Sequence, residues 1–250
     1  MNTPYKLGWV PDLPDYRDYV YKTPRIAIPK SADLRGLCPP VYDQGQLGSC
    51  TANAVAASIQ YSQIKQRRSQ FPPSRLFIYY NARLLMGTAG YDSGSYIRDG
   101  VKTANKQGAC PESVWAYNVS KFAARPPVPC YNVALKERIL QYERMDNSSI
   151  SQLQACLASG SPFVFGFSVY ESFMSQNVSR TGIMPMPTNR ERFLGGHAVM
   201  AVGYDSKKGV FIVRNSWGRG WGMGGYFTMP YQYITNTDLC DDFWKISLVS

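Results

Sequence analysis

The segment YDQGQLGSCTANA, residues 42–54, places Cys50 between a glycine-containing loop and an apolar pattern that is typical of a helix. The apolar residues recur at helical spacing: Ala52, Val55, Ala56 and Ile59. The unpaired N–H groups and partial positive charge of a helix N-terminus stabilise a thiolate and an oxyanion. We therefore expect the pKa of Cys50 to be lowered, and the Gln44 carboxamide to be a second donor to an oxyanion. For a lone Gly-Ser-Cys, a small buried thiol in a turn is the commoner outcome.

The only histidine of the chain, His197, stands in FLGGHAVMAVGYD, residues 193–205, after two glycines and at the mouth of a predicted strand. A thiolate nucleophile commonly needs an imidazole, which forms the ion pair and later protonates the leaving amine. A single histidine excludes HExxH metalloprotease sites and zinc sites with several histidines. Taken by itself, a lone histidine is more often a packing residue.

A third segment, VRNSWGRGWGMGGYF, residues 213–227, begins at the end of the next predicted strand. Its Asn215 is a suitable acceptor for the imidazole N–H of His197, because an amide fixes the tautomer and ring orientation without adding a charge. The indole of Trp217 is large enough to shield that hydrogen bond from water. The alternative is a turn rich in glycine and tryptophan that packs two strands.

The rest of the chain predicts helices in its first half and strands in its later part, which is an α+β fold. Helical patterns follow Ser74 (RLFIYYNARLL), lie around 97–104 before Gly108, and follow Ser149. Strand patterns cover 162–170, 198–204, 210–215, 225–229 and 243–249, and in the first of them Phe163, Phe165, Phe167 and Val169 alternate onto one face. Prolines predict an extended arm at 1–37 and a linker or tight crossover at 124–130, ARPPVPC.

Length and charge limit the remaining possibilities. The 250 residues suit one large domain or two small, closely packed ones, and no apolar run reaches the roughly 18 residues of a membrane span. No secretory signal begins the sequence, which leaves the location open between the cytoplasm and export after processing or by another route. The net charge of +10 comes from scattered basic residues, so we do not expect nucleic-acid or polyanion binding, although the charge does not exclude it. We expect a monomer.

The six cysteines include no CxxC pair, so zinc-ribbon and thioredoxin-like sites lack their defining spacing. Cys110 and Cys130 flank a loop-rich stretch and are candidates for a disulfide. Cys156 lies beside the apolar face of a predicted helix, where we expect a buried, unreactive thiol.

Three blocks, in this order, resemble those of the papain-like cysteine peptidases, the family that includes the cathepsins: QGxxGSC ending at Cys50, GHAVxAVGY around His197, and NSWGxxWGxxGY from Asn215. His197 follows Cys50 by 147 residues, within the family range of about 130–150. The resemblance implies that Cys50 is the nucleophile, His197 its base and acid, and Asn215 the orienting group. It also implies an oxyanion hole made by Gln44 and the backbone N–H of Cys50, with no metal or cofactor.

The same resemblance implies an α+β fold of two lobes, one helical and one an antiparallel β-barrel-like lobe, with the active-site cleft between them. It places a peptidase domain at 28–250, with the helical lobe at about 45–130 and the β lobe at about 131–250 together with a strand at 28–44. Residues 1–27 are then an N-terminal extension. We expect it to be a short propeptide or lid over the cleft, and a purely structural strap is an equal alternative.

The chain also departs from the family pattern. Leu47 and Thr51 stand where the family usually has cysteine and tryptophan, which suggests a bacterial or viral branch. YDSGSY, 91–96, replaces the family's GCNGG, and its Gly94 is expected to keep the backbone close to substrate, together with Gly196 and Trp217. Because glycines precede His197, we hypothesise a roomy pocket that accepts a bulky apolar or aromatic side chain two residues before the scissile bond.

These observations predict a cysteine peptidase that hydrolyses protein or peptide substrates through a thiolate–imidazolium pair and an acyl-enzyme. Two alternatives remain. An acyl or peptidyl transferase uses the same pair of residues with an amine in place of water, and a papain-fold binding module keeps the fold without catalysis.

Overall fold

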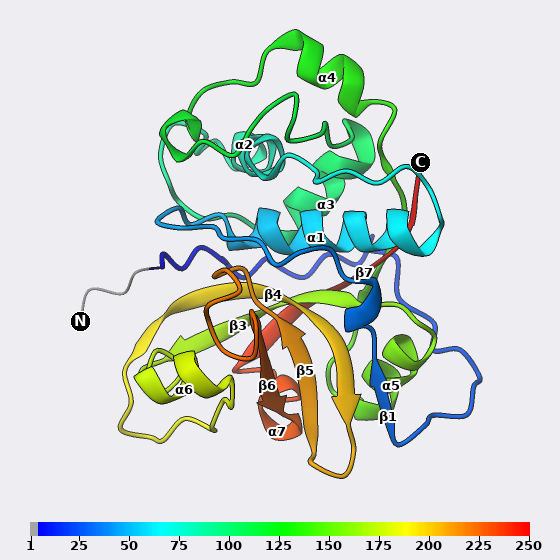
Figure 1. Cartoon of the computed structure of the whole chain (residues 1–250), viewed down its shortest axis with the longest axis vertical. Coiled ribbons are helices and arrows are strands. Elements are labelled where there is room, and N and C mark those ends of the chain that lie inside the picture. The colour runs from blue at the N-terminus through cyan, green and yellow to red at the C-terminus, as the bar shows by residue number, and fades with distance from the viewer. Residues whose placement is uncertain (1–4) are drawn as a thin grey trace.

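The computed structural model describes residues 5–250, which form a helical half and a half built on one antiparallel sheet (Figure 1). The helices are α1 Cys50–Lys65, α2 Arg75–Leu85, α3 Ile97–Lys106, α4 Val128–Ala134, α5 Ile150–Ala158, α6 Gln176–Thr181 and α7 Tyr231–Ile234. The strands are β1 Ser31–Asp33, β2 Ile139–Met145, β3 Phe163–Tyr170, β4 Phe193–Asp205, β5 Val210–Arg214, β6 Tyr226–Pro230 and β7 Cys240–Val249. The predicted α+β class is therefore confirmed. None of the helices within residues 5–250 has the length and apolar character to cross a bilayer.

Local capping explains why several helices begin where the sequence predicts. The Ser74 hydroxyl accepts the N–H of Phe77 at the start of α2, and the Ser149 hydroxyl accepts the N–H of Gln152 at the start of α5. In α1 the sequence predicts a single apolar stripe, but every residue from Cys50 to Gln63 is buried. The difference arises because α1 packs against α2 and α3 on one side and against β4 and β7 on the other.

The sheet has the strand order β2-β7-β3-β4-β5-β6, and β1 pairs with β4 in addition. Phe163, Phe165 and Phe167 point to the core on the face away from α1, whereas Val164 joins the core shared with α1. Both faces of the central strands are thus buried, which explains their nearly continuous apolar sequences. Within residues 5–250 the edge strands β2 and β6 do not pair with each other, so the implied barrel is an open, curved sheet.

The short helices α6 and α7 were not predicted, and two further segments differ from the prediction. ARPPVPC, predicted as a linker or tight crossover, leads into α4, which has proline in its first turn, where the missing N–H is tolerated. Strand β2 was not predicted, because in ILQYERM only the end residues Ile139 and Met145 are buried and the apolar alternation is lost.

The N-terminal arm is extended as predicted and passes between α1 and the sheet before it turns to β1 (Figure 1). Two isolated bridges attach it in parallel orientation, Trp9 to Ser95 and Val20 to Arg144. Ion pairs hold the middle of the arm. Asp12 lies 3.0 Å from Arg98 and 2.7 Å from Arg144, and Asp18 lies 2.6 Å from Arg98. Residues 1–4 of the predicted extension lie outside the described residues.

Candidate active site

Cys50 is the first residue of α1, and its side chain is fully buried where the helix meets β4. Burial raises the pKa of the thiol to about 11, while the backbone N–H groups of Ala198 and Gly8 act in the opposite direction. The expectation of a lowered pKa is therefore wrong for the conformation with the arm in place. A helix N-terminus stabilises a thiolate by a small amount, and complete exclusion of water costs more.

His197 lies within β4, one residue before Ala198, and Asn215 follows the end of β5. The imidazole Nε2–H donates to Asn215 Oδ1 at 2.8 Å. His197 Nδ1 is buried and has no hydrogen-bond partner among the described residues, so in this tautomer its lone pair is available as a base. Burial lowers the pKa of His197 to about 4, and the hydrogen bond that His197 donates to Asn215 partly offsets this effect.

Trp217 covers this histidine. Its ring stacks on the imidazole of His197 with centroids 4.7 Å apart, and the indole is itself almost fully buried. The stacked indole leaves water little access to the hydrogen bond between His197 and Asn215, as the sequence predicts.

Gln44 holds its carboxamide in one orientation. Its Oε1 accepts a hydrogen bond from the Ser216 hydroxyl at 2.7 Å. Its Nε2 donates to two carbonyl oxygens, those of Leu47 and Lys6, both at 2.9 Å. Since Ser216 fixes which end of the amide is the acceptor, the NH₂ group faces the arm and is ready to donate to an oxyanion at that place.

The arm occupies every position that was predicted to bind substrate. Ser95 N–H donates to the Gly8 carbonyl at 2.9 Å, and the N–H groups of Gly8 and Trp9 both donate to the Gly196 carbonyl at 3.0 Å. A Cβ at Gly94 would lie 2.3 Å from the Gly8 carbonyl oxygen, and one at Gly196 would lie 2.4 Å from the Trp9 carbonyl oxygen.

Only glycine permits this close approach at Gly94 and Gly196. On the other side of the site, Tyr5 stacks on Trp217 with centroids 4.6 Å apart.

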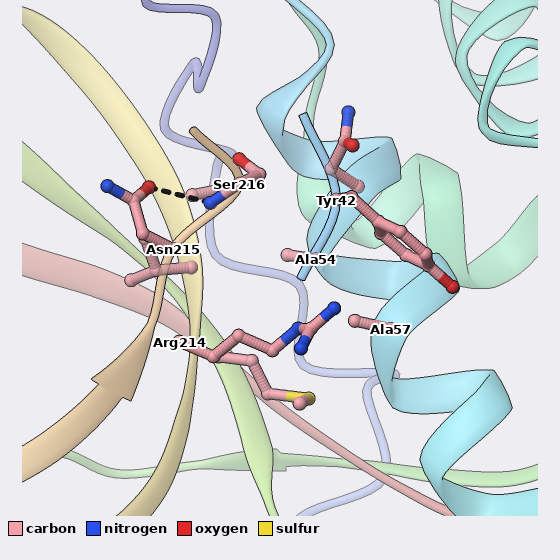
Figure 2. Close-up of a pocket in the computed structure, with 10 residues that line it drawn as sticks. Tyr42, Ala54, Ala57, Arg214, Asn215 and Ser216 are labelled. Carbon is pink, nitrogen blue, oxygen red and sulfur yellow. Dashed lines mark hydrogen bonds between the residues drawn. The ribbon is translucent and has the colours of Figure 1, made fainter. Parts of the chain in front are cut away.

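A small pocket lies behind the site, between α1 and the end of β5 (Figure 2). Ala54 and Ala57 line it from the helix, and Arg214, Asn215 and Ser216 line it from the sheet. Its free volume of about 10 Å³ has room for about one water molecule, so it is too small to bind a substrate.

Sequence reasoning missed three residues of the site. Ser216 orients Gln44, and its place inside the NSWG block was a usable signal. Ser95 pairs with the arm backbone next to Gly94. Asp242 accepts a hydrogen bond from the Trp9 indole across 233 residues of sequence, a distance that no local pattern spans.

Neither a disulfide nor a metal-binding group is found among the described residues. All six cysteines are free, so the disulfide considered for Cys110 and Cys130 is not formed, although both thiols lie in one small buried cluster. Cys156 is fully buried, as predicted. Within residues 5–250, no three His, Cys, Asp or Glu side chains are grouped so that they could hold a metal ion.

Comparisons with known proteins agree with this geometry. Residues 28–241 match the family model described as papain family cysteine protease. A peptidase C1-like protein of Acanthamoeba polyphaga mimivirus is 49% identical over 216 residues, which cover 83% of this chain and 70% of the relative. The crystal structure of xylellain, a cysteine protease from Xylella fastidiosa, superposes with a TM-score of 0.92 at 46% identity and covers 98% of this chain and 96% of its own. Digestive procathepsin L 3 of Tenebrio molitor shares the fold at 20% identity, with a TM-score of 0.71 over 90% of this chain and 73% of its own.

Proposed function

Because the chain belongs to the papain family of cysteine proteases, we propose that it hydrolyses peptide bonds through a Cys50–His197 pair. The observation that carries this proposal is the hydrogen bond of 2.8 Å from His197 Nε2 to Asn215, which leaves Nδ1 as the base. The backbone N–H of Ala198, the residue after this histidine, acts to lower the pKa of Cys50, which supports a pairing of the two groups where α1 packs against β4.

In the proposed reaction the Cys50 thiol passes its proton to His197 Nδ1, and the thiolate attacks the carbonyl carbon of the scissile bond. The negative charge that develops on the carbonyl oxygen is stabilised by the Gln44 amide and the Cys50 backbone N–H. The imidazolium then protonates the leaving amine as the C–N bond breaks, which gives a thioester. Water, deprotonated by His197, attacks this thioester, the C–S bond breaks, and the acid product and the thiol are released.

We further propose that the arm restrains this activity. With the arm in place, Cys50 and His197 are both fully buried, and burial holds the pKa of the thiol at about 11 and that of the imidazole at about 4. At neutral pH the proton therefore stays on sulfur. Displacement of the arm admits water, which lowers the cost of charging both groups and favours the ion pair.

The path of the arm supports restraint without self-cleavage. Within the arm, the carbonyl that accepts from Gln44 Nε2 belongs to Lys6, whereas the N–H that acts to lower the pKa of Cys50 belongs to Gly8, which also donates to the Gly196 carbonyl. The arm thus separates the two features that a scissile peptide must present at one residue, a carbonyl oxygen at the oxyanion hole and its carbon at the nucleophile.

The test is hydrolysis of a quenched fluorogenic peptide by the full-length chain, together with labelling by an epoxide or vinyl-sulfone thiol probe. We expect turnover and a single label, both lost in Cys50→Ala, with Cys156→Ala as a matched buried control that keeps both. Product analysis with added amines separates hydrolysis from acyl transfer. A folded chain with no turnover and no label at Cys50, also after Trp9→Ala displaces the arm, would favour the binding module.

A further inference from the structure

The side chain of Trp9 fills a flat slot in the sheet. A Cβ at Gly166 of β3 would lie 1.9 Å from Trp9 Cε2, and one at Gly196 of β4 would lie 2.7 Å from Trp9 Cε3. The indole therefore lies directly on the backbone of two adjacent strands and is 7% exposed. The slot exists because both positions are glycine, and its shape suits a planar double ring.

A buried carboxylate, Asp242 of β7, lies at the edge of this slot that faces the indole N–H. Its side chain is fully buried, and its backbone has φ of +59°, next to an irregularity in the β3–β7 pairing. Asp242 Oδ2 accepts the Trp9 indole N–H at 2.8 Å and the backbone N–H of Asp12 at 3.0 Å. Asp242 Oδ1 accepts Arg144 Nη2 at 3.0 Å.

The two oxygens of Asp242 thus have different partners. Oδ1 is bound by Arg144, which belongs to the body of the protein and stays when the arm leaves. Both donors to Oδ2 belong to the arm and leave with it. An acceptor in so buried a position is costly when it has no donor, so whatever replaces the arm binds better if it supplies an N–H at this point.

From this we infer that Asp242 is a specificity-determining residue, which selects substrates with tryptophan at the position whose side chain enters the slot. The inference rests on the proposed function, because it takes the cleft that the arm fills as the substrate cleft. Gly166 and Gly196 leave room for the double ring, and Asp242 accepts a hydrogen bond from its N–H. When Asp242 is ionised, the guanidinium of Arg144, 3.0 Å from Oδ1, balances its charge, which favours a neutral N–H over a second cation at the same place.

The experiment uses the full-length chain with Trp9→Ala, so that the slot lacks its own occupant. The substrates are alanine-based peptides that differ at one residue, which is tryptophan, 3-benzothienylalanine, phenylalanine or arginine. Benzothienylalanine is the decisive comparison, because it has the shape of tryptophan with sulfur in place of the N–H. We expect kcat/KM to be roughly ten- to a hundredfold higher for tryptophan than for benzothienylalanine, the range expected for an unpaired buried acceptor.

The variant Asp242→Asn tests the residue itself. Asparagine tolerates positive φ, but it has one acceptor oxygen, which cannot serve both Arg144 and the indole. We expect the ratio of tryptophan to benzothienylalanine to fall toward one. Asp241→Asn is the matched control, because its half-exposed side chain also pairs with Arg144, whereas the indole N–H of Trp9 donates to Asp242, and we expect it to retain the ratio.

Binding of the same peptides to the Trp9→Ala, Cys50→Ala chain, measured by calorimetry, keeps the inference separate from catalysis. A preference for tryptophan in binding without any hydrolysis by the Trp9→Ala chain supports the slot and overturns the proposed function. Equal binding and equal kcat/KM for tryptophan and benzothienylalanine overturn the inference and leave peptide hydrolysis standing. A preference for arginine also overturns it, since the slot then selects charge.

Discussion

Replacement of Trp9 by alanine is expected to activate the full-length chain. The indole is 7% exposed and donates a hydrogen bond to the buried Asp242. Truncation of a buried tryptophan to alanine costs about 3–5 kcal/mol. We call the chain closed when the arm lies against the site and open when it has left. The loss of stabilisation affects only the closed conformation, because Trp9 has left this slot in the open one. Each 1.4 kcal/mol or so is a factor of ten, so the ratio of open to closed chains is expected to rise by roughly 10² to 4 × 10³.

Two measurements report the change in the ratio of open to closed chains. The second-order rate of Cys50 labelling by a vinyl-sulfone probe and kcat/KM for a fluorogenic peptide both scale with the fraction of open chains, until most chains are open. Tyr16→Ala is the matched control, because this arm tyrosine is 99% exposed and we expect its removal to change neither rate. If a folded Trp9→Ala chain labels and hydrolyses at the wild-type rate, the arm is a structural strap and the restraint is refuted.

Three further results follow from the same contacts. Gly8→Ala is expected to displace the arm about as effectively as Trp9→Ala, because its Cβ would lie 1.9 Å from the backbone oxygen of Gly48. The rate of Cys50 labelling tests this expectation. Gly36→Ala is the control, because the space around Gly36 is open. Gln44→Ala in the Trp9→Ala chain is expected to lower kcat by roughly 10²–10³ with little change in KM, because it removes one oxyanion donor; an unchanged kcat would argue against that role. Burial, and to a smaller extent the charge of Asp12, raise the pKa of Asp242 to about 7. The folded chain therefore keeps a proton on Asp242 up to about pH 7, whereas an exposed carboxyl releases it near pH 4. The stabilisation is complete at low pH and is lost as the pH rises through 7. The unfolding free energy of the wild type relative to Asp242→Asn is therefore expected to fall between about pH 4 and 7 in denaturant titrations, and a constant difference would contradict the assignment.

The positions of most helices and strands could be predicted from the sequence because the signals are local, and the residues that we propose to react stand in equally short blocks. Ser74 and Ser149 cap the helices that follow them, and the alternating phenylalanines of β3 face one core as predicted. Segments with weak alternation, such as β2, escaped prediction because their burial depends on neighbours that are distant in sequence.

The sequence by itself determined the family, the α+β class and the order of the blocks that carry Cys50, His197 and Asn215, since these depend on short-range patterns and spacing. Only the tertiary structure decided that the arm lies between α1 and the sheet (Figure 1) and that water is excluded from the thiol, which reverses the direction of its pKa shift. It also decided that Asp242 accepts the hydrogen bond of the Trp9 indole. The physical reason is that burial and hydrogen-bond partners are set by the whole fold, whereas caps and periodicity act within a few residues.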